Sequence, residues 1–134
     1  MKVRWRKPND LALASYEDAL ELCKKLLIDS SEFMVYLLKN CGWCLSYLGR
    51  FDESVQQLNK ARDIAEKLAE RNEPTSCKAN VYQNLAKLFN YWKPYCQEAT
   101  FYARKAIEMQ EFLSKIDLAK MQIIDEKGEE TPSK

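Results

Sequence analysis

Apolar residues recur every three or four positions along five stretches of this chain. That spacing places them on one face of an α-helix, with polar side chains on the opposite face. The pattern predicts helices over about residues 9–29, 30–48, 52–71, 76–92 and 95–124. The chain is therefore expected to be all-α, with about five helices.

The residues between these stretches are typical of helix ends. Asn9 or Asp10, just after Pro8, can cap the first helix, because a short polar side chain accepts from free backbone donors. Ser30 or Ser31 can cap the second helix in the same way. The helical pattern is then broken at Gly49, Pro74 and Pro94. Turns this short predict that neighbouring helices pack antiparallel, as stacked hairpins.

Each helix has an apolar stripe that predicts its core-facing side. The first stripe is Leu13, Tyr16, Ala19, Leu20, Cys23, Leu26 and Leu27, and the second is Phe33, Met34, Leu37, Leu38, Cys41, Leu45 and Leu48. The third is Val55, Leu58, Ala61, Ile64, Ala65 and Leu68, and the fourth is Val81, Tyr82, Leu85, Ala86 and Phe89. The fifth is Ala99, Ala103, Ala106, Ile107, Leu113 and Ile116.

The two ends differ from this helical domain, which is expected to cover residues 9–125. Residues 1–8 form a basic segment with the aromatic Trp5, which could contact phosphates but is more simply a solvated end. Residues 126–134 are rich in Glu, Lys, Thr and Pro and are expected to be a disordered tail.

Composition narrows the class of protein. The 134 residues suit one domain, and 31% charged residues nearly cancel to a net charge of +1. No global field then favours nucleic acid or a membrane surface. No apolar run approaches the ~18 residues of a membrane span, and the basic N-terminus lacks the apolar segment of a signal peptide. A soluble cytoplasmic protein is expected.

The chain lacks the residues of most catalytic sites. It has no histidine, the commonest general base and the partner of nucleophilic serine or cysteine. Its five cysteines, without a secretory signal, are expected to be reduced thiols. Cys41 and Cys44 form the one close pair, so zinc is not expected, and no Gly-rich phosphate loop is present. The sequence predicts a non-enzymatic protein without cofactor, and thiol redox chemistry through Cys41 and Cys44 is a remote alternative.

Residues 38–68 resemble the tetratricopeptide repeat family, a unit of about 34 residues with two helices. The matching residues are Leu38, Cys41-Gly42, Leu45, Gly49 at the turn, the turn aromatic Phe51, Ser54 in place of an alanine, and Ala61. A second unit matches through Tyr82, Asn84, Leu85-Ala86, Phe89, Tyr95, Ala99 and Ala106. Residues 11–28, with Tyr16 and Ala19, are similar to the second helix of a further unit. The resemblance implies a short right-handed solenoid of helical hairpins.

The resemblance also implies a concave groove, lined by the first helix of each unit. Off the core stripe, the helices over residues 30–48 and 76–92 carry aromatic, amide and basic side chains suited to a peptide or a partner helix. The expected groove residues are Tyr36, Lys39, Asn40, Trp43, Tyr47, Asn80, Gln83, Asn84, Lys87 and Tyr91. Asn40 and Asn84 match carboxylate-binding asparagines of chaperone-tail-binding members, but Trp43 and Asn80 depart from that pattern and do not favour such a ligand.

The sequence thus predicts a protein-protein interaction module, an adaptor or scaffold that binds a peptide or helix. Two alternatives stay open. The aromatic residues of the second helix, Tyr36, Trp43 and Tyr47, could instead pack against a neighbouring helix or a C-terminal helix folded back into the groove. The exposed ends of the stack could pair with another copy, as a structural self-assembly module, or with further repeats of a longer chain.

Overall fold

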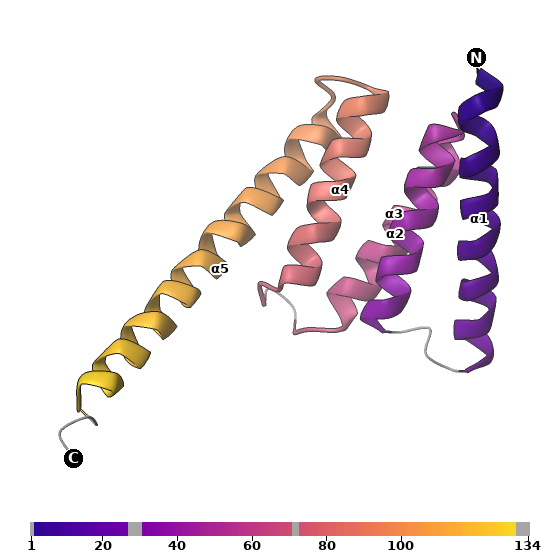
Figure 1. Ribbon diagram of the computed structural model, residues 1–134. Coiled ribbons are helices and arrows are strands. Elements are labelled where there is room, and N and C mark those ends of the chain that lie inside the picture. Colours follow the sequence, from indigo (N-terminus) through magenta and orange to yellow (C-terminus); the bar gives the residue numbers. More distant parts are fainter. Residues whose placement is uncertain (1, 27–30, 71–72, 131–134) are drawn as a thin grey trace.

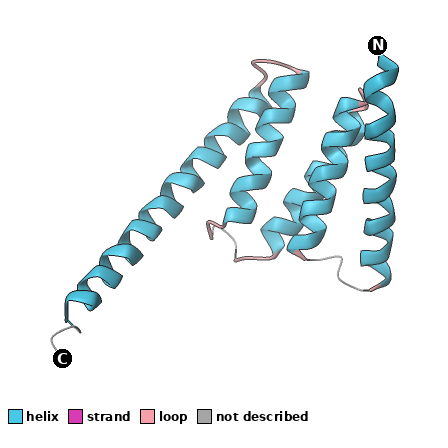
Figure 2. Ribbon diagram, in the orientation of Figure 1, coloured by secondary structure: helices cyan, strands magenta, loops and turns pink. Residues whose placement is uncertain are grey.

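The computed structural model describes the backbone of residues 2–26, 31–70 and 73–130, and the side chains of 8–26, 31–70 and 73–127. It consists of α1 (Lys2–Lys25), α2 (Glu32–Tyr47), α3 (Phe51–Lys67), α4 (Ser76–Trp92) and α5 (Gln97–Glu130). Figure 1 shows them side by side, with α1 at one end and α5 at the other. Within these ranges the regular structure is helical throughout, which confirms the all-α fold (Figure 2).

Side-chain caps begin the two helices in the middle of the chain, as was predicted for α2 but not for α4. The Ser31 hydroxyl accepts from the Met34 amide at 3.2 Å and begins α2. Thr75 does the same for α4, accepting from the Lys78 amide at 3.1 Å. Gly49 has a φ of 79°, a conformation that glycine adopts without steric cost, and it reverses the chain between α2 and α3.

Two predicted boundaries at the chain ends are wrong. Helix α1 begins at Lys2 and contains Pro8, so neither Asn9 nor Asp10 caps it. At the other end, α5 continues to Glu130 instead of ending near Ile124. Residues 126–130 contain four good helix formers and no proline, and the helix continues through Gly128 despite its cost of about 1 kcal/mol. The remaining tail residues, 131–134, lie outside the described residues.

The turn before α5 also differs from the prediction. Tyr95 was expected to be the turn aromatic of the second unit, yet its side chain is 97% exposed and its φ is 65°. Helix α5 begins two residues later, at Gln97. The turn aromatic of the first unit, Phe51, does pack: its ring stacks on Trp92 with centroids 5.4 Å apart. The two turns are therefore not equivalent.

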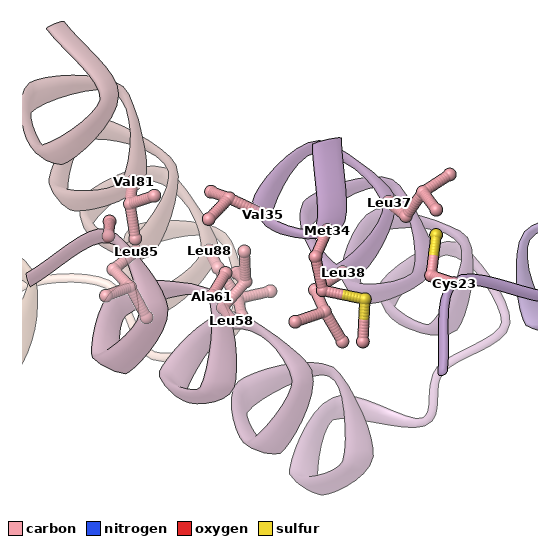
Figure 3. Close-up of a cluster of buried hydrophobic side chains, with 11 residues drawn as sticks. Cys23, Met34, Val35, Leu37, Leu38, Leu58, Ala61, Val81, Leu85 and Leu88 are labelled. Atoms are coloured by element: carbon pink, nitrogen blue, oxygen red, sulfur yellow. The ribbon is translucent and has the colours of Figure 1, made fainter. Parts of the chain in front are cut away.

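The helices form antiparallel hairpins. Each helix packs on its neighbours along the chain, and α2 also packs against α4. The core lies between α1, α2, α3 and α4 (Figure 3). Leu58, Leu85 and Leu88 are fully buried there. Ala61 and Ala65 lie among them and let α3 approach its neighbours closely.

Some predicted core residues are exposed, because helix periodicity defines a face but not which neighbour covers it. The exposed ones are Leu26, Phe33, Leu68 and Ile107. Leu27 lies outside the described residues. The structure instead buries Val35, Cys44 and Leu88, which the predicted stripes did not include.

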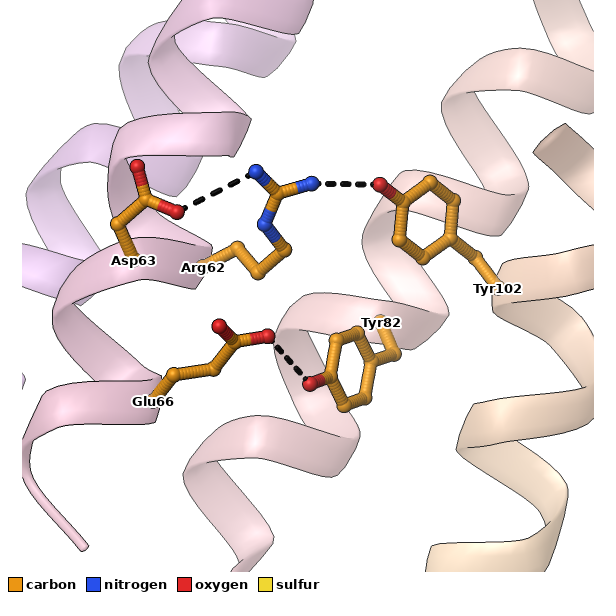
Figure 4. Close-up of polar contacts among 5 residues, drawn as sticks. All are labelled: Arg62, Asp63, Glu66, Tyr82 and Tyr102. Atoms are coloured by element: carbon orange, nitrogen blue, oxygen red, sulfur yellow. Dashed lines mark hydrogen bonds and ion pairs between the residues drawn. The ribbon is translucent and has the colours of Figure 1, made fainter. Parts of the chain in front are cut away.

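Two side-chain hydrogen bonds join the α2–α3 hairpin to the α4–α5 hairpin (Figure 4). The Arg62 guanidinium on α3 donates to the Tyr102 hydroxyl on α5 at 2.6 Å. The Tyr82 hydroxyl on α4 donates to the Glu66 carboxylate on α3 at 2.7 Å. Burial, and then this carboxylate, raise the pKa of Tyr82. Within the described residues, no helix is long and apolar enough to cross a membrane.

Candidate partner-binding groove

A hollow of about 480 Å³ lies between α1, α2 and α4, and we call it the α1–α2–α4 groove. Its lining residues are Ala12, Tyr16, Asn40, Trp43, Cys44, Tyr47, Asn84 and Lys87. Helices α2 and α4 are the first helices of the two hairpins, so the groove is on the side that the sequence predicted. Helix α1 forms a further wall of the groove, which was not predicted from the sequence.

A ladder of polar contacts joins α2 to α4. The Lys39 ammonium donates to the Asn80 side-chain oxygen at 3.2 Å, and the Trp43 indole N–H donates to the Asn84 side-chain oxygen at 2.7 Å. The Asn84 amide also donates to the Asn80 carbonyl oxygen at 2.7 Å. Both pairs are spaced by four residues along each helix, so they lie one turn apart on facing surfaces. The predicted residues of α2 and α4 therefore meet.

Aromatic rings lie along α2 with much of their surface exposed. Tyr36 and Tyr47 are 52% and 60% exposed, and Trp43 lies between them. The Trp43 and Tyr47 ring centroids are 5.9 Å apart, and the Lys39 ammonium lies 5.3 Å from the centre of the Tyr36 ring. Trp43 itself also packs against the core. The free aromatic surface is therefore that of the two tyrosines.

Asn40 provides a hydrogen-bond donor in the groove. Its side-chain nitrogen is buried, and it has no hydrogen-bond partner among the described residues. A buried amide donor without a partner costs about 1–3 kcal/mol. A ligand oxygen in this hollow would remove that cost only if the Asn40 side chain turned its nitrogen toward the hollow.

Five of the ten predicted residues do not line this groove: Tyr36, Lys39, Asn80, Gln83 and Tyr91. Gln83 lines a second hollow between α4 and α5, which Lys87 also lines. Tyr91 has its ring 5.9 Å from that of Phe51, at the turn between α2 and α3. Tyr91 shares a face of α4 with Asn84, whereas Gln83 points about 100° away around the helix, and neither lines the α1–α2–α4 groove.

Sequence reasoning missed the contribution of α1. Ala12 and Tyr16 are one turn apart, line the groove and pack against the buried cluster that includes Cys44. The apolar stripe of α1 was interpreted only as core, although its four-residue spacing would have allowed a second, groove-facing row. Phe33 was also taken for core, yet it is 53% exposed on α2.

The groove is not covered by the C-terminal helix. In the described part of the chain, α5 packs along α4 and makes no packing contact with α2. Figure 1 shows α5 diverging from the stack on the far side of α4. The alternative in which that helix folds back over Tyr36, Trp43 and Tyr47 does not hold for these residues.

The pair Cys41 and Cys44 lies within α2, and both thiols are buried. Burial raises the pKa of Cys41 to about 12 and also raises the pKa of Cys44. A redox-active cysteine requires the opposite, a lowered pKa and an accessible sulfur. The two residues act as small apolar packing groups between α1 and α2.

Comparison with known proteins supports the family resemblance. Residues 3–67 match the family model described as tetratricopeptide repeat, which covers nearly all of α1 and the α2–α3 hairpin. No curated protein and no solved structure matches the chain. Proteins built from such repeats present extended concave surfaces for binding.

Proposed function

We infer that this chain, whose residues 3–67 match the tetratricopeptide repeat family, is a non-enzymatic module that binds a peptide or helix of a protein partner. The binding surface is the α1–α2–α4 groove. The observation that carries this proposal is the exposed aromatic surface of α2: Tyr47 lines the groove, and Tyr36 lies one helical turn before the groove residue Asn40.

The chemistry of the groove favours a polypeptide. Tyrosine combines a large contact area with only two side-chain torsions, so little entropy is lost when a partner packs on it. The side-chain oxygens of Asn40 and Asn84 can accept hydrogen bonds from backbone N–H groups of a ligand. Aromatic anchors beside amides are the combination found at the energetic centres of protein interfaces.

The charge of the groove narrows the partner further. Lys87 lines it from α4, and the Lys39 ammonium on α2 lies beside it, bonded to Asn80. Helix α4 contains no acidic residue, and α2 has one, Glu32, at its first position. A ligand with apolar side chains and at least one acidic group therefore fits the groove better than a basic one.

The test is selection of peptides from a random library on the immobilised full chain, followed by affinity measurement with fluorescence anisotropy. We expect Tyr36→Ala and Tyr47→Ala each to weaken binding by about 5- to 30-fold, the usual effect of removing an aromatic anchor. Tyr95→Asn is the matched control, because Tyr95 is 97% exposed and outside the groove. Peptides that bind the wild type, the two groove variants and the control variant with equal affinity would refute the groove assignment.

A further inference from the structure

Helix α5 is twice as long as its packing partner. It has 34 residues against 17 in α4, or about 51 Å against about 25 Å at 1.5 Å per residue. The Tyr102 ring lies 6.1 Å from those of both Tyr82 and Phe89, which puts residue 102 level with the middle of α4. Because α4 runs antiparallel to α5, the first turn of α4 lies level with about residue 113 of α5. Residues 114–130, which we call the overhang, extend beyond it (Figure 1).

The overhang carries apolar side chains that no other described part of the chain covers. Leu118, Met121 and Ile124 are 61%, 60% and 66% exposed. A helix segment of about this length is only marginally stable in water unless an apolar face packs against something. A row of large apolar side chains on an unsupported helix is also a common mark of a protein contact.

The same chain offers a complementary surface. A hollow of about 600 Å³, the α4–α5 groove, runs between these two helices on the face away from α3. Small side chains, Ala86, Ala103 and Ala106, line it, and Ile107 forms part of one wall. The groove extends along α5 to Ser114 and Leu118, at the start of the overhang. The receptor and the projecting helix are therefore parts of one continuous surface.

We propose that two copies of the chain pair through antiparallel α5 helices, with each overhang lying in the α4–α5 groove of the other. The two-fold axis passes near Ser114, a small residue that allows the helices to approach closely. Residues 115–130 of one copy then lie level with residues 98–113 of the other, which is the length of α5 that α4 accompanies. Met121 comes opposite Ile107 in this register. Each copy has one overhang and one groove, so the arrangement closes at two.

Charge favours this direction of pairing. Asp125 and Glu126 on the overhang come level with residues 102–103 of the other copy, beside Lys87 on the rim of the groove. A parallel pairing would place Asp125 and Glu126 of both copies next to one another. Opposite charges at the antiparallel contact attract, whereas like charges at the parallel one repel.

The test is the mass of the full chain in solution, measured by sedimentation equilibrium from micromolar to hundreds of micromolar concentration. We expect the mass to rise from 15.7 kDa toward twice that value and no further. Leu118→Lys should weaken association by about tenfold or more. The matched control is Ile123→Lys: Ile123 is 51% exposed but lies about 140° around the helix from Leu118. It should associate as the wild type does.

A charge reversal tests the register without touching an apolar residue. Lys87→Glu and Asp125→Lys should each weaken the dimer, and the double variant should restore it. Tyr36→Ala and Tyr47→Ala should leave the mass unchanged, which separates this surface from peptide binding. A monomer at the highest concentration, a mass that grows past the dimer, equal loss in the Leu118 and Ile123 variants, or failure of the double variant to recover would overturn the proposal.

Discussion

The Ser54 hydroxyl on α3 donates a hydrogen bond of 2.6 Å to the carbonyl oxygen of Gly42 on α2, with both residues buried. The family pattern has an alanine at the position of Ser54, so this chain adds a polar tie where the two helices cross. A Cβ atom on Gly42 would lie 3.1 Å from Leu58 Cγ and 3.3 Å from the Ser54 carbonyl oxygen. The crossing therefore depends on the absence of a side chain.

We expect Gly42→Ala to destabilise the protein by about 1–3 kcal/mol through overpacking. The better helix propensity of alanine would offset about 1 kcal/mol of that. Leu58 is fully buried and cannot move aside easily. Urea unfolding followed by circular dichroism measures the change. As a comparison, Gly49→Asn should be tolerated, because nothing lies near that position and asparagine accepts a positive φ. An alanine variant about 1 kcal/mol more stable than the wild type, the full gain in helix propensity, would contradict the close crossing.

Trp43→Phe should lower the free energy of unfolding by about 1 kcal/mol, because it removes the 2.7 Å bond from the indole to Asn84 while it keeps most of the aromatic packing. Asn84→Ala should cost a similar amount. The two changes together should cost clearly less than their sum, since both remove the same bond. Additive losses in this double-mutant cycle would show that the bond does not couple α2 to α4.

Lys78 is 4% exposed, and its ammonium donates to the carbonyl oxygens of Glu70 and Glu73 at 3.0 and 2.7 Å. Lys78→Met should loosen the turn before α4, because two backbone acceptors lose a charged donor. We expect faster cleavage by a glutamate-specific protease after Glu70, since the bond after Glu73 is protected by Pro74. Lys60→Met, at an exposed lysine of α3, serves as the control. Equal cleavage of both variants would argue against the tie.

Cys41 should make the protein sensitive to alkali. Burial raises its pKa to about 12 in the folded state, against an ordinary value of 9.0. The unfolded chain thus loses this proton first. The contribution to stability is complete below pH 9 and is lost as the pH rises toward 12. Urea unfolding at about pH 8 and about pH 10.5 should show Cys41→Ala losing about 1–2 kcal/mol less than the wild type between these conditions. Parallel pH profiles would contradict the burial of this thiol.

Capping chemistry could be predicted from sequence because it is local. Ser31 and Thr75 cap helices through bonds to amides three residues away, and Gly49 adopts a backbone conformation that favours glycine. These positions depend on their own neighbours and not on the rest of the fold. The same holds for the spacing that brought Lys39 and Trp43 onto one face of α2.

The errors concern residues whose surroundings depend on distant elements. Phe33 is at the edge of the stripe on α2, and periodicity alone cannot say that no helix covers it. Tyr95 was aligned with Phe51 by pattern, although only Phe51 has Trp92 beside it. The groove wall from α1 was missed for a related reason. Its residues, Ala12 and Tyr16, carry no functional signal before the helices are packed. That the groove binds a partner remains a prediction.

The order of packing along the stack has a consequence for local opening. The α2–α3 hairpin lies between α1 and α4, whereas α5 packs along α4 and is tied to α3 by the hydrogen bond between Arg62 and Tyr102. Amide hydrogens of α2 and α3 should therefore exchange with solvent only when the whole fold opens, while those of the overhang exchange through fraying. A partner in the α1–α2–α4 groove would bind the region that opens last. Pairing through α5 would protect the region that opens first.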